Sequence, residues 1–397
     1  MFKLLKIENK ISLQNLIIVS YILSILCCWA YGNSYILYAT LSIGFIIFTY
    51  GKFTLKVIDK CSKMEFLVIV IIYITFMTSL LNNGIKSMLL VNVSLIMPFA
   101  ISYLNINYKN VQRQIIFASL VNIIFVILIL INSSEWNSNS LAFMIFNGVS
   151  IGFIWFKVAR NITSKIWASI YLFTASVFLL SAESRNAGIV MAICIMLLMI
   201  PKRILKKKWL YRTIYLSAVL ATVFASDVMT YIFENETLMQ QLVKYTSAFS
   251  DKVWGMDTHL TLLLRVKNNF SESGILAQLL GEGIKKDHTH NLFYQSLYFY
   301  GYLGTIIIYG IYIIFFEIAY KLIKKYNNNM IAGCYIILIG HFLMQIGEVY
   351  MLGSESAIII SLLPAGLILN QKRKKELEYK RRMRKKKYEN FINNTLL

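Results

Sequence analysis

Charged residues, prolines and histidines are all scarce in this sequence of 397 residues. Only 15% of the residues are charged, whereas soluble domains carry about a quarter, so a soluble globular chain is excluded. Three prolines are too few for a proline-rich, low-complexity chain. The five cysteines form no C-x-x-C pair, which excludes the common zinc and thioredoxin-like motifs. Since there are only four histidines, proton transfer near neutral pH has few candidate positions.

Apolar residues dominate the rest of the chain. It is 57% hydrophobic, with a mean hydropathy of +0.61. Stretches such as residues 12–30 and 64–82 are apolar for about 18–20 residues, which is enough to cross ~30 Å of hydrocarbon. We therefore predict an all-α polytopic membrane protein of about 12 transmembrane helices with one large external loop. The predicted spans are 12–30, 33–51, 64–82, 87–104, 114–132, 139–156, 166–183, 187–200, 213–233, 291–316, 330–347 and 356–371.

Lysines and arginines are distributed unevenly between the two sides of these spans. When the amino terminus is placed inside, the external segments hold only 8 of the 40. This asymmetry follows the positive-inside rule and predicts that both termini are cytoplasmic. We interpret the formal charge of +21 as contact with anionic membrane lipid at the inner leaflet, and expect no nucleic acid as a partner. The five cysteines then lie in spans or on the inner side, so no external disulfide is available.

The loop between the ninth and tenth predicted spans is much longer than the others. The predicted domains are an N-terminal bundle of about nine spans (1–233), this external loop (234–290), a C-terminal bundle of about three spans (291–371) and a basic cytoplasmic tail (372–397). A loop of this length is usually functional. Its stretches "LMQQLVKYTSAF" and "HLTLLLRVKNNF" repeat apolar residues with a helical period, which predicts short amphipathic helices on the membrane surface.

Three of the four histidines, His259, His288 and His290, belong to this loop. Because histidine exchanges a proton near neutral pH, His290, directly before the tenth span, is our candidate general base at the outer face. The stretch "DHTH" (287–290) could instead hold a metal ion with His259, but it lacks the second ligand pair of a zinc site. We therefore predict neither a metal nor a cofactor. The fourth histidine, His341, lies within a span and is interpreted as an interhelix histidine.

Two external arginines suit an anionic headgroup. Arg185 occupies a short turn in "LLSAESRNAGIVMA", and Arg265 follows "HLTLLL" in the large loop. A guanidinium presents a planar fork of donors that fits phosphate oxygens, and it stays charged. Simpler interpretations stay open: Arg185 as an interfacial side chain that reaches lipid phosphate, and Arg265 as a solvated charge on a helix. Lys267 is the next candidate if Arg265 has no such role.

The glycines in "LLGEGIKKDHTHNLF" do not form a phosphate loop, because no Lys-Ser or Lys-Thr follows them. They predict a turn through which the loop re-enters the membrane. Two further glycines, Gly301 and Gly304, stand in the apolar run that follows and predict close packing between helices.

These features resemble the O-antigen polymerases and O-antigen ligases of bacterial envelope polysaccharide synthesis. In topology the resemblance covers the whole chain, and in motifs it covers residues 180–305. The family has a Ser-Arg pair at the start of a span, an arginine in the large loop, a Gly-x-Gly turn leading to His-Asn, and a following Gly-x-x-Gly. The matching residues are Ser184, Arg185, Arg265, Gly281, Gly283, His290, Asn291, Gly301 and Gly304. Glu282 departs from the family, in which an apolar residue is usual between the two glycines.

The resemblance implies a glycosyltransferase that polymerises undecaprenyl-diphosphate-linked oligosaccharide repeat units at the outer face of the bacterial cytoplasmic membrane. Arg185 and Arg265 would stabilise the diphosphate leaving group. His290 would accept the proton of the attacking hydroxyl, and Asn291 would cap the helix start or orient the histidine. The residues expected to contact substrate are Asn291, Gly281, Gly283, Lys267 and Tyr294, of which the tyrosine also fits an interfacial aromatic belt. A chain-length regulator and a flippase are the implied protein partners.

Two alternatives accompany this hypothesis. A ligase that transfers the glycan to a final acceptor shares the same motifs. A flippase or transporter of lipid-linked oligosaccharide belongs to another class, in which charged groups and broken helices gather in the middle of the membrane. Here His341 is the only ionisable side chain that we place in the middle of a span, and no internal repeat is evident. Both observations favour the enzyme.

Overall fold

The computed structural model describes residues 151–181, 184–235, 237–238, 250–283, 289, 291–346 and 357–395, with isolated positions between 70 and 150. Apart from those positions, the first five predicted spans and most of the sixth lie outside the described residues. Within the described ranges every regular element is an α-helix, which confirms the all-α class for this part of the chain. The helices are α7 (Ile151–Val158), α8 (Ile162–Ser181), α9 (Arg185–Met199), α10 (Lys202–Leu205), α11 (Lys208–Glu234), α13 (Ser250–Glu272), α14 (Ile275–Leu280), α15 (Leu292–Tyr326), α16 (Asn329–Met344) and α18 (Ala357–Thr395).

Three of these helices are long and apolar enough to cross a membrane, namely α8, α11 and α15. They correspond to the predicted spans 166–183, 213–233 and 291–316. The apolar helices α9 and α16 are shorter, with 15 and 16 residues. The short eighth predicted span is short in the structure as well, because Ser184 caps α9 by accepting a hydrogen bond from the Ala187 amide. The total of about 12 spans stays a prediction.

Helix α16 lies at the centre of the described bundle. It is buried along nearly its whole length and packs against α7, α9, α11, α15 and α18. Two glycines permit this packing: a Cβ would lie 2.7 Å from the Ile154 backbone at Gly333, and 2.5 Å from the Phe146 ring at Gly340. His341 is buried and meets the Phe146 ring edge-on at 5.4 Å, as expected of an interhelix histidine.

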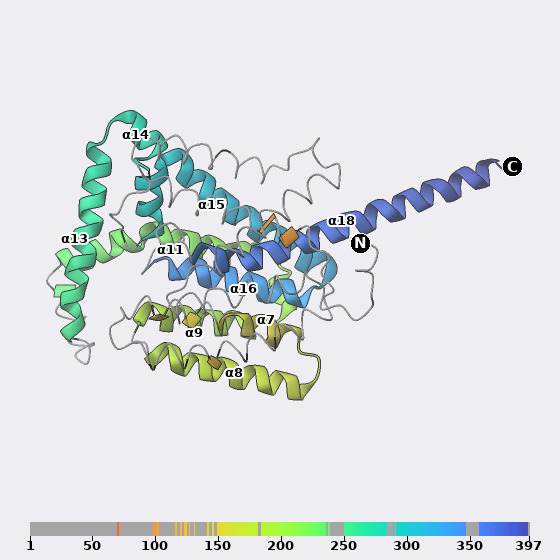
Figure 1. The fold of residues 1–397 in the computed structure, drawn as a ribbon, viewed down its shortest axis with the longest axis horizontal. Coiled ribbons are helices and arrows are strands. Elements are labelled where there is room, and N and C mark those ends of the chain that lie inside the picture. The colour runs from red at the N-terminus through yellow and green to blue at the C-terminus, as the bar shows by residue number, and fades with distance from the viewer. Residues whose placement is uncertain are drawn as a thin grey trace, which may run out of the picture.

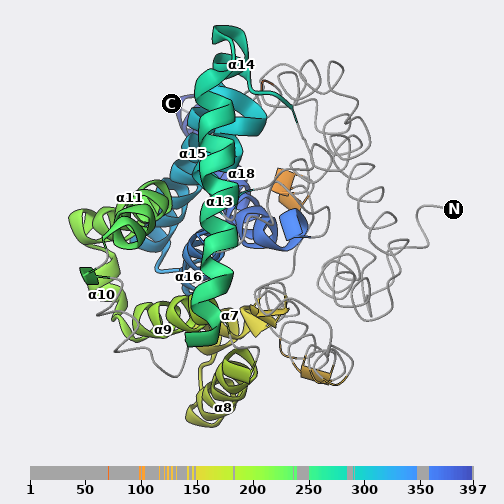
Figure 2. The ribbon, with the colours of Figure 1, turned by 90° about the vertical axis from the view of Figure 1, so that its left-hand side faces the viewer.

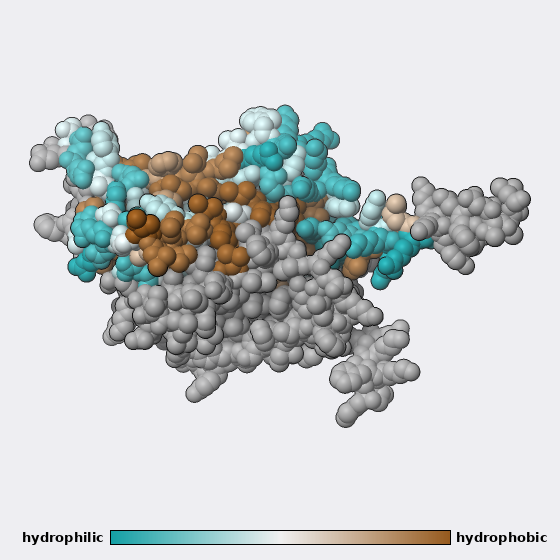
Figure 3. Space-filling model, turned by 90° about the horizontal axis from the view of Figure 1, so that it is seen from above, coloured by the Kyte–Doolittle hydropathy of each residue, from teal (hydrophilic) through white to brown (hydrophobic). Residues whose placement is uncertain are grey.

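The outward faces of α8 and α11 are apolar. Exposed side chains include Ile166, Phe173 and Leu180 on α8, and Leu220 and Phe224 on α11. Seen from the side opposite α8, Figure 3 also shows an apolar surface between two hydrophilic margins. Exposing apolar area to water costs about 25 cal/mol per Å², whereas hydrocarbon accommodates it. The surface therefore supports a membrane protein.

Helix α13 and the C-terminal part of α18 mark opposite ends of the bundle. Figure 1 shows α13 crossing one end of the helices, while α18 extends from the other end. Side chains of α18 are buried from Leu363 to Gln371, and the first exposed one is Lys374, close to the predicted start of the tail at residue 372. The described part of the tail continues the same helix. There Lys375 donates a 2.8 Å hydrogen bond to Glu378 and holds the pKa of that carboxyl below its usual value.

Thiol labelling tests which end faces outward. Ser271 on α13 and Lys380 on α18 are both exposed, so in a cysteine-free background each cysteine variant should be reactive after cell lysis. On intact cells, a membrane-impermeant maleimide should label Ser271→Cys and spare Lys380→Cys, because the positive-inside rule places the basic tail in the cytoplasm. Labelling of the tail variant alone would reverse the predicted topology.

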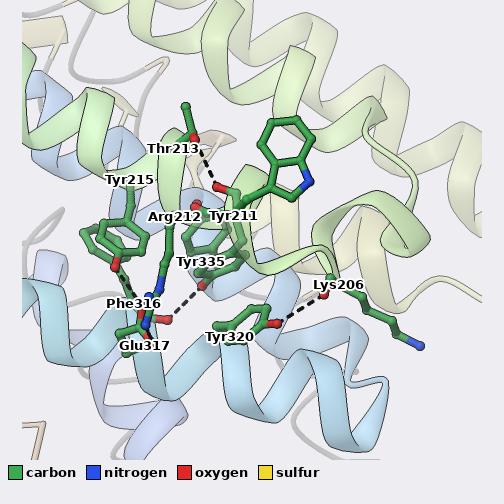
Figure 4. Close-up of polar contacts among 10 residues, drawn as sticks. Lys206, Tyr211, Arg212, Thr213, Tyr215, Phe316, Glu317, Tyr320 and Tyr335 are labelled. Carbon is green, nitrogen blue, oxygen red and sulfur yellow. Dashed lines mark hydrogen bonds and ion pairs between the residues drawn. The ribbon is translucent and has the colours of Figure 1, made fainter.

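At the tail end of the bundle, an ion pair joins α11 to α15 (Figure 4). Arg212 donates two hydrogen bonds to Glu317, of 2.7 and 3.1 Å, and Tyr215 donates a third to the same carboxylate at 2.7 Å. Further tyrosine hydroxyls donate to backbone carbonyls across the helix contacts: Tyr211 to Phe316, Tyr320 to Lys206, and Tyr335 to Tyr211. These bonds fix how α11 and α16 lie against each other and against α15.

Removing either charge should destabilise this contact. Arg212→Gln and Glu317→Gln should each lower the thermal unfolding midpoint of the detergent-solubilised protein. Because the two groups share two hydrogen bonds, the double variant should lose less stability than the two single variants lose together. The difference, the coupling free energy, should be about 1 kcal/mol. Thr213→Ala is a matched control, since the Thr213 hydroxyl bonds only within its own helix, to the Trp209 carbonyl. Strictly additive losses would mean that the pair contributes nothing.

Candidate functional site

Helix α13 carries polar residues of the predicted external loop across the end of the bundle (Figures 1 and 2). The stretch "HLTLLLRVKNNF" belongs to this one helix of 23 residues and does not form a short helix of its own. Leu263, Val266 and Phe270 are buried at helical spacing, and the Phe270 ring meets Tyr302 of α15 at 5.4 Å. The amphipathic character of this stretch is therefore confirmed. The stretch "LMQQLVKYTSAF" lies outside the described residues, except for its first residue.

Helix α15 is broken at Gly301, where φ is +64° and ψ is −171°. The break separates residues 292–300, which we call the half-helix, from residues 302–326. The half-helix extends only about 13 Å, which is too short to cross a membrane by itself, so an unbroken span within α15 would have to begin after the break. Figure 1 shows α15 changing direction beside α14. The predicted span 291–316 thus joins two segments that the structure separates.

The glycine turn after α14 docks on this break through its backbone. Gly281 and Gly283 are buried and have φ of +85° and +81°. The Glu282 amide donates to the Tyr298 carbonyl at 2.8 Å, and the Gly283 amide donates to the Phe299 carbonyl at 3.1 Å. In an unbroken helix these carbonyls would accept from amides four residues further on, so the turn replaces donors that the break removes. The structure thereby gives both glycines a backbone role, which the expectation of substrate contact did not include.

The half-helix begins at Asn291, whose side chain caps it as predicted. Its Oδ1 accepts hydrogen bonds from the amides of Phe293 and Tyr294, at 2.9 and 3.2 Å. Its Nδ2 donates to the carbonyl of Thr222 at 3.1 Å. Asn291 is therefore buried beside the middle of α11, well before that helix ends at Glu234. Asn291 therefore lies inside the bundle, whereas the predicted span 291–316 placed it at the membrane surface.

Arg185 begins α9 at the same end of the bundle. The neighbouring Asn186 donates its side-chain amide to the Met344 carbonyl at 3.1 Å. The Leu292 amide of the half-helix donates to the next carbonyl, that of Gln345, at 3.0 Å. The start of α9, the end of α16 and the start of the half-helix therefore meet. The side chain of Arg185 itself lies outside the described residues.

A polar cluster joins α11, α13 and the half-helix. Asp227 Oδ1 accepts a hydrogen bond from the Tyr294 hydroxyl at 2.8 Å and another from Lys267 Nζ at 3.4 Å. Lys267 Nζ also lies 5.7 Å from the centre of the Tyr294 ring. This Asp227 cluster (Asp227, Lys267 and Tyr294) brings together two predicted substrate-binding residues. Sequence analysis missed Asp227, although a carboxylate inside an apolar helix is a signal that could have identified it.

Arg265 lies away from this cluster. It is exposed on α13, and it precedes Lys267 by two residues, or about 200° around a helix axis. Lys267, and not Arg265, is therefore the basic residue of this stretch that contacts α11. His288 and His290, and the side chain of His259, lie outside the described residues. Among the side chains that the structure does describe, no three of His, Cys, Asp or Glu are grouped to hold a metal ion.

Comparison with known proteins adds no constraint. No protein-family model matches the chain, and none of the curated proteins matches it. The functional assignment rests on the residues and contacts described above.

Proposed function

We propose that this protein is an integral-membrane glycosyltransferase that polymerises undecaprenyl-diphosphate-linked repeat units into O-antigen or capsular polysaccharide. The reaction takes place at the outer face of the bacterial cytoplasmic membrane. The observation that carries the proposal is the Asp227 cluster, in which Tyr294 and Lys267, both expected to contact substrate, meet beside α11. Asn291, also expected to contact substrate, instead caps the half-helix and is buried against the same helix. The three apolar helices support a substrate whose lipid stays in the bilayer.

The proposed reaction needs no nucleotide. Outside the membrane there is neither ATP nor a nucleotide sugar, so the activated donor arrives already linked to lipid. Transfer breaks the bond between the sugar C1 and the diphosphate, whose oxygen keeps the electron pair, and joins C1 to the acceptor hydroxyl oxygen. In this proposal Arg185 stabilises the charge on the diphosphate, and His290 takes the hydroxyl proton. Arg265 is the less supported of the two arginines, because it lies on the exposed face of α13.

The broken helix raises a second candidate function, the transport of lipid-linked oligosaccharide. Transporters use half-helices whose N-terminal amides face an anionic substrate. Here the protein itself takes those amides: Asn291 accepts from Phe293 and Tyr294, and Gln345 accepts from Leu292. This N-terminus is therefore not available to a diphosphate, which favours the enzyme. A ligase shares the proposed chemistry and differs only in its acceptor.

Purified protein in liposomes with lipid-linked repeat units tests the three candidates. We expect a ladder of longer lipid-linked products in excess EDTA and without nucleotide, since arginine and histidine supply the proposed catalytic groups. One transfer to a final acceptor without a ladder would indicate the ligase. Movement of substrate between leaflets without a new glycosidic bond would indicate the transporter. Activity that only zinc restores would support the metal hypothesis for residues 287–290.

A further inference from the structure

We infer that the Asp227 cluster is a saccharide subsite, which binds hydroxyl groups of the repeat-unit sugar and leaves the diphosphate to other residues. The inference rests on the proposed function and deepens it. It adds Asp227 to the site and changes the role expected of Lys267. The cluster draws on three elements, α11, α13 and the half-helix, so its geometry depends on the folded protein.

The charge balance of the cluster disfavours a diphosphate. Lys267 Nζ lies 3.4 Å from Asp227 Oδ1, so the two formal charges offset each other locally. A phosphate oxygen bound to the ammonium would also lie near the carboxylate and be repelled by it, which weakens the attraction of the lysine. A neutral hydroxyl meets no such repulsion. It can donate to the carboxylate and accept from the ammonium at the same time.

The carboxylate of Asp227 is oriented and accessible. Tyr294 and Lys267 both donate to Oδ1, whereas Oδ2 accepts no hydrogen bond from the side chains that the structure describes. The side chains of Asp227 and Lys267 are 47% and 49% exposed. An ionised carboxylate accepts hydrogen bonds at both oxygens, so Oδ2 has capacity for a donor from outside the protein. The hydroxyl groups of a sugar are donors of this kind.

Aromatic side chains flank this carboxylate. Tyr294 is bonded to it directly, and Tyr231 follows Asp227 by four residues, which places both on the same face of α11. Tyr231 is 63% exposed. The C–H faces of a sugar ring pack on aromatic rings while its hydroxyls reach neighbouring polar atoms. A carboxylate beside two tyrosines therefore suits a neutral, polyhydroxylated ring.

Two probes separate sugar binding from diphosphate binding: the free oligosaccharide repeat unit, and a sugar-free polyprenyl diphosphate. Binding of each is measured to the full-length protein in nanodiscs. Asp227→Asn keeps the size of the side chain and removes its charge, so the Kd for the oligosaccharide should rise about tenfold. The Kd for the polyprenyl diphosphate should stay the same or fall, since a repelling charge is gone. Glu234→Gln, an exposed carboxylate on the same helix, is the matched control and should change neither value.

If Asp227→Asn folds and its Kd for the oligosaccharide is unchanged, the inference is overturned. It is also overturned if the variant loses affinity only for the polyprenyl diphosphate. If Asp227→Asn does not fold, Tyr294→Phe carries the test, because it removes only the hydroxyl that orients the carboxylate. That variant should weaken oligosaccharide binding about threefold, and no change would overturn the inference. Wild-type protein that binds the oligosaccharide but never elongates it would refute the polymerase and leave the subsite intact.

Discussion

Gly301→Ala should strongly destabilise the folded protein, whereas Gly310→Ala on the same helix should be tolerated. At Gly301 a Cβ would lie 2.4 Å from the backbone of Leu279 and 2.5 Å from the amide nitrogen of Gly281. The backbone there, with φ +64° and ψ −171°, is in a region open essentially only to glycine. Because the neighbouring atoms are backbone, they cannot rotate away as the end of a side chain can. We expect a loss of at least about 3 kcal/mol, a large share of ordinary protein stability.

Fluorescence-detected size exclusion and thermal unfolding in detergent measure this effect. Gly281→Ala should behave in the same way, since its Cβ would lie 2.3 Å from the Phe299 carbonyl oxygen. Because both substitutions disrupt one docking contact, the double variant should be little worse than either single variant. Apart from the adjoining backbone of its own helix, no described atom lies within 4 Å of a Cβ added at Gly310, which makes it the matched control. A Gly301→Ala protein that unfolds at the wild-type temperature would mean that the turn does not dock on α15.

His290→Ala should abolish detectable long polymer, whereas His288→Ala should leave a usable enzyme. General-base catalysis typically contributes about 10²–10⁴-fold, so losing the base leaves too few transfers for a long chain. The residues on both sides of position 290 are held by the bundle: the Thr289 amide donates to Gln295 Oε1 at 2.6 Å, and Asn291 caps the half-helix. Elongation of lipid-linked repeat units in liposomes is the measurement.

Each variant must first insert and unfold at the wild-type temperature. With a histidine base, wild-type activity should fall as the pH drops and the imidazole becomes protonated. A dispensable His290 with an essential His288 would mean that the motif is aligned two residues out of register. If both histidines were dispensable, another acceptor such as His259 or Asp287 would take the proton, and the histidine-base mechanism would fail.

Several helices could be predicted from the sequence because their causes are local. The spans that match α8, α11 and α16 follow from long, largely apolar runs, which are favourable in hydrocarbon wherever they occur. Ser184 and Asn328 cap the helices that follow them by contacts within three residues. The buried face of α13 follows from helical spacing alone.

The break in α15 and the Asp227 cluster were decided by tertiary structure. Residues 291–316 read as one apolar run, and hydropathy cannot place a break inside it. Gly301 leaves the helical region where the turn at Gly281, distant in the chain, supplies the amides that the broken helix lacks. Likewise, Asp227 and Lys267 are 40 residues apart and meet only because α13 crosses the end of α11. Hydropathy and charge are properties of one stretch of chain, whereas these contacts depend on how separate helices pack.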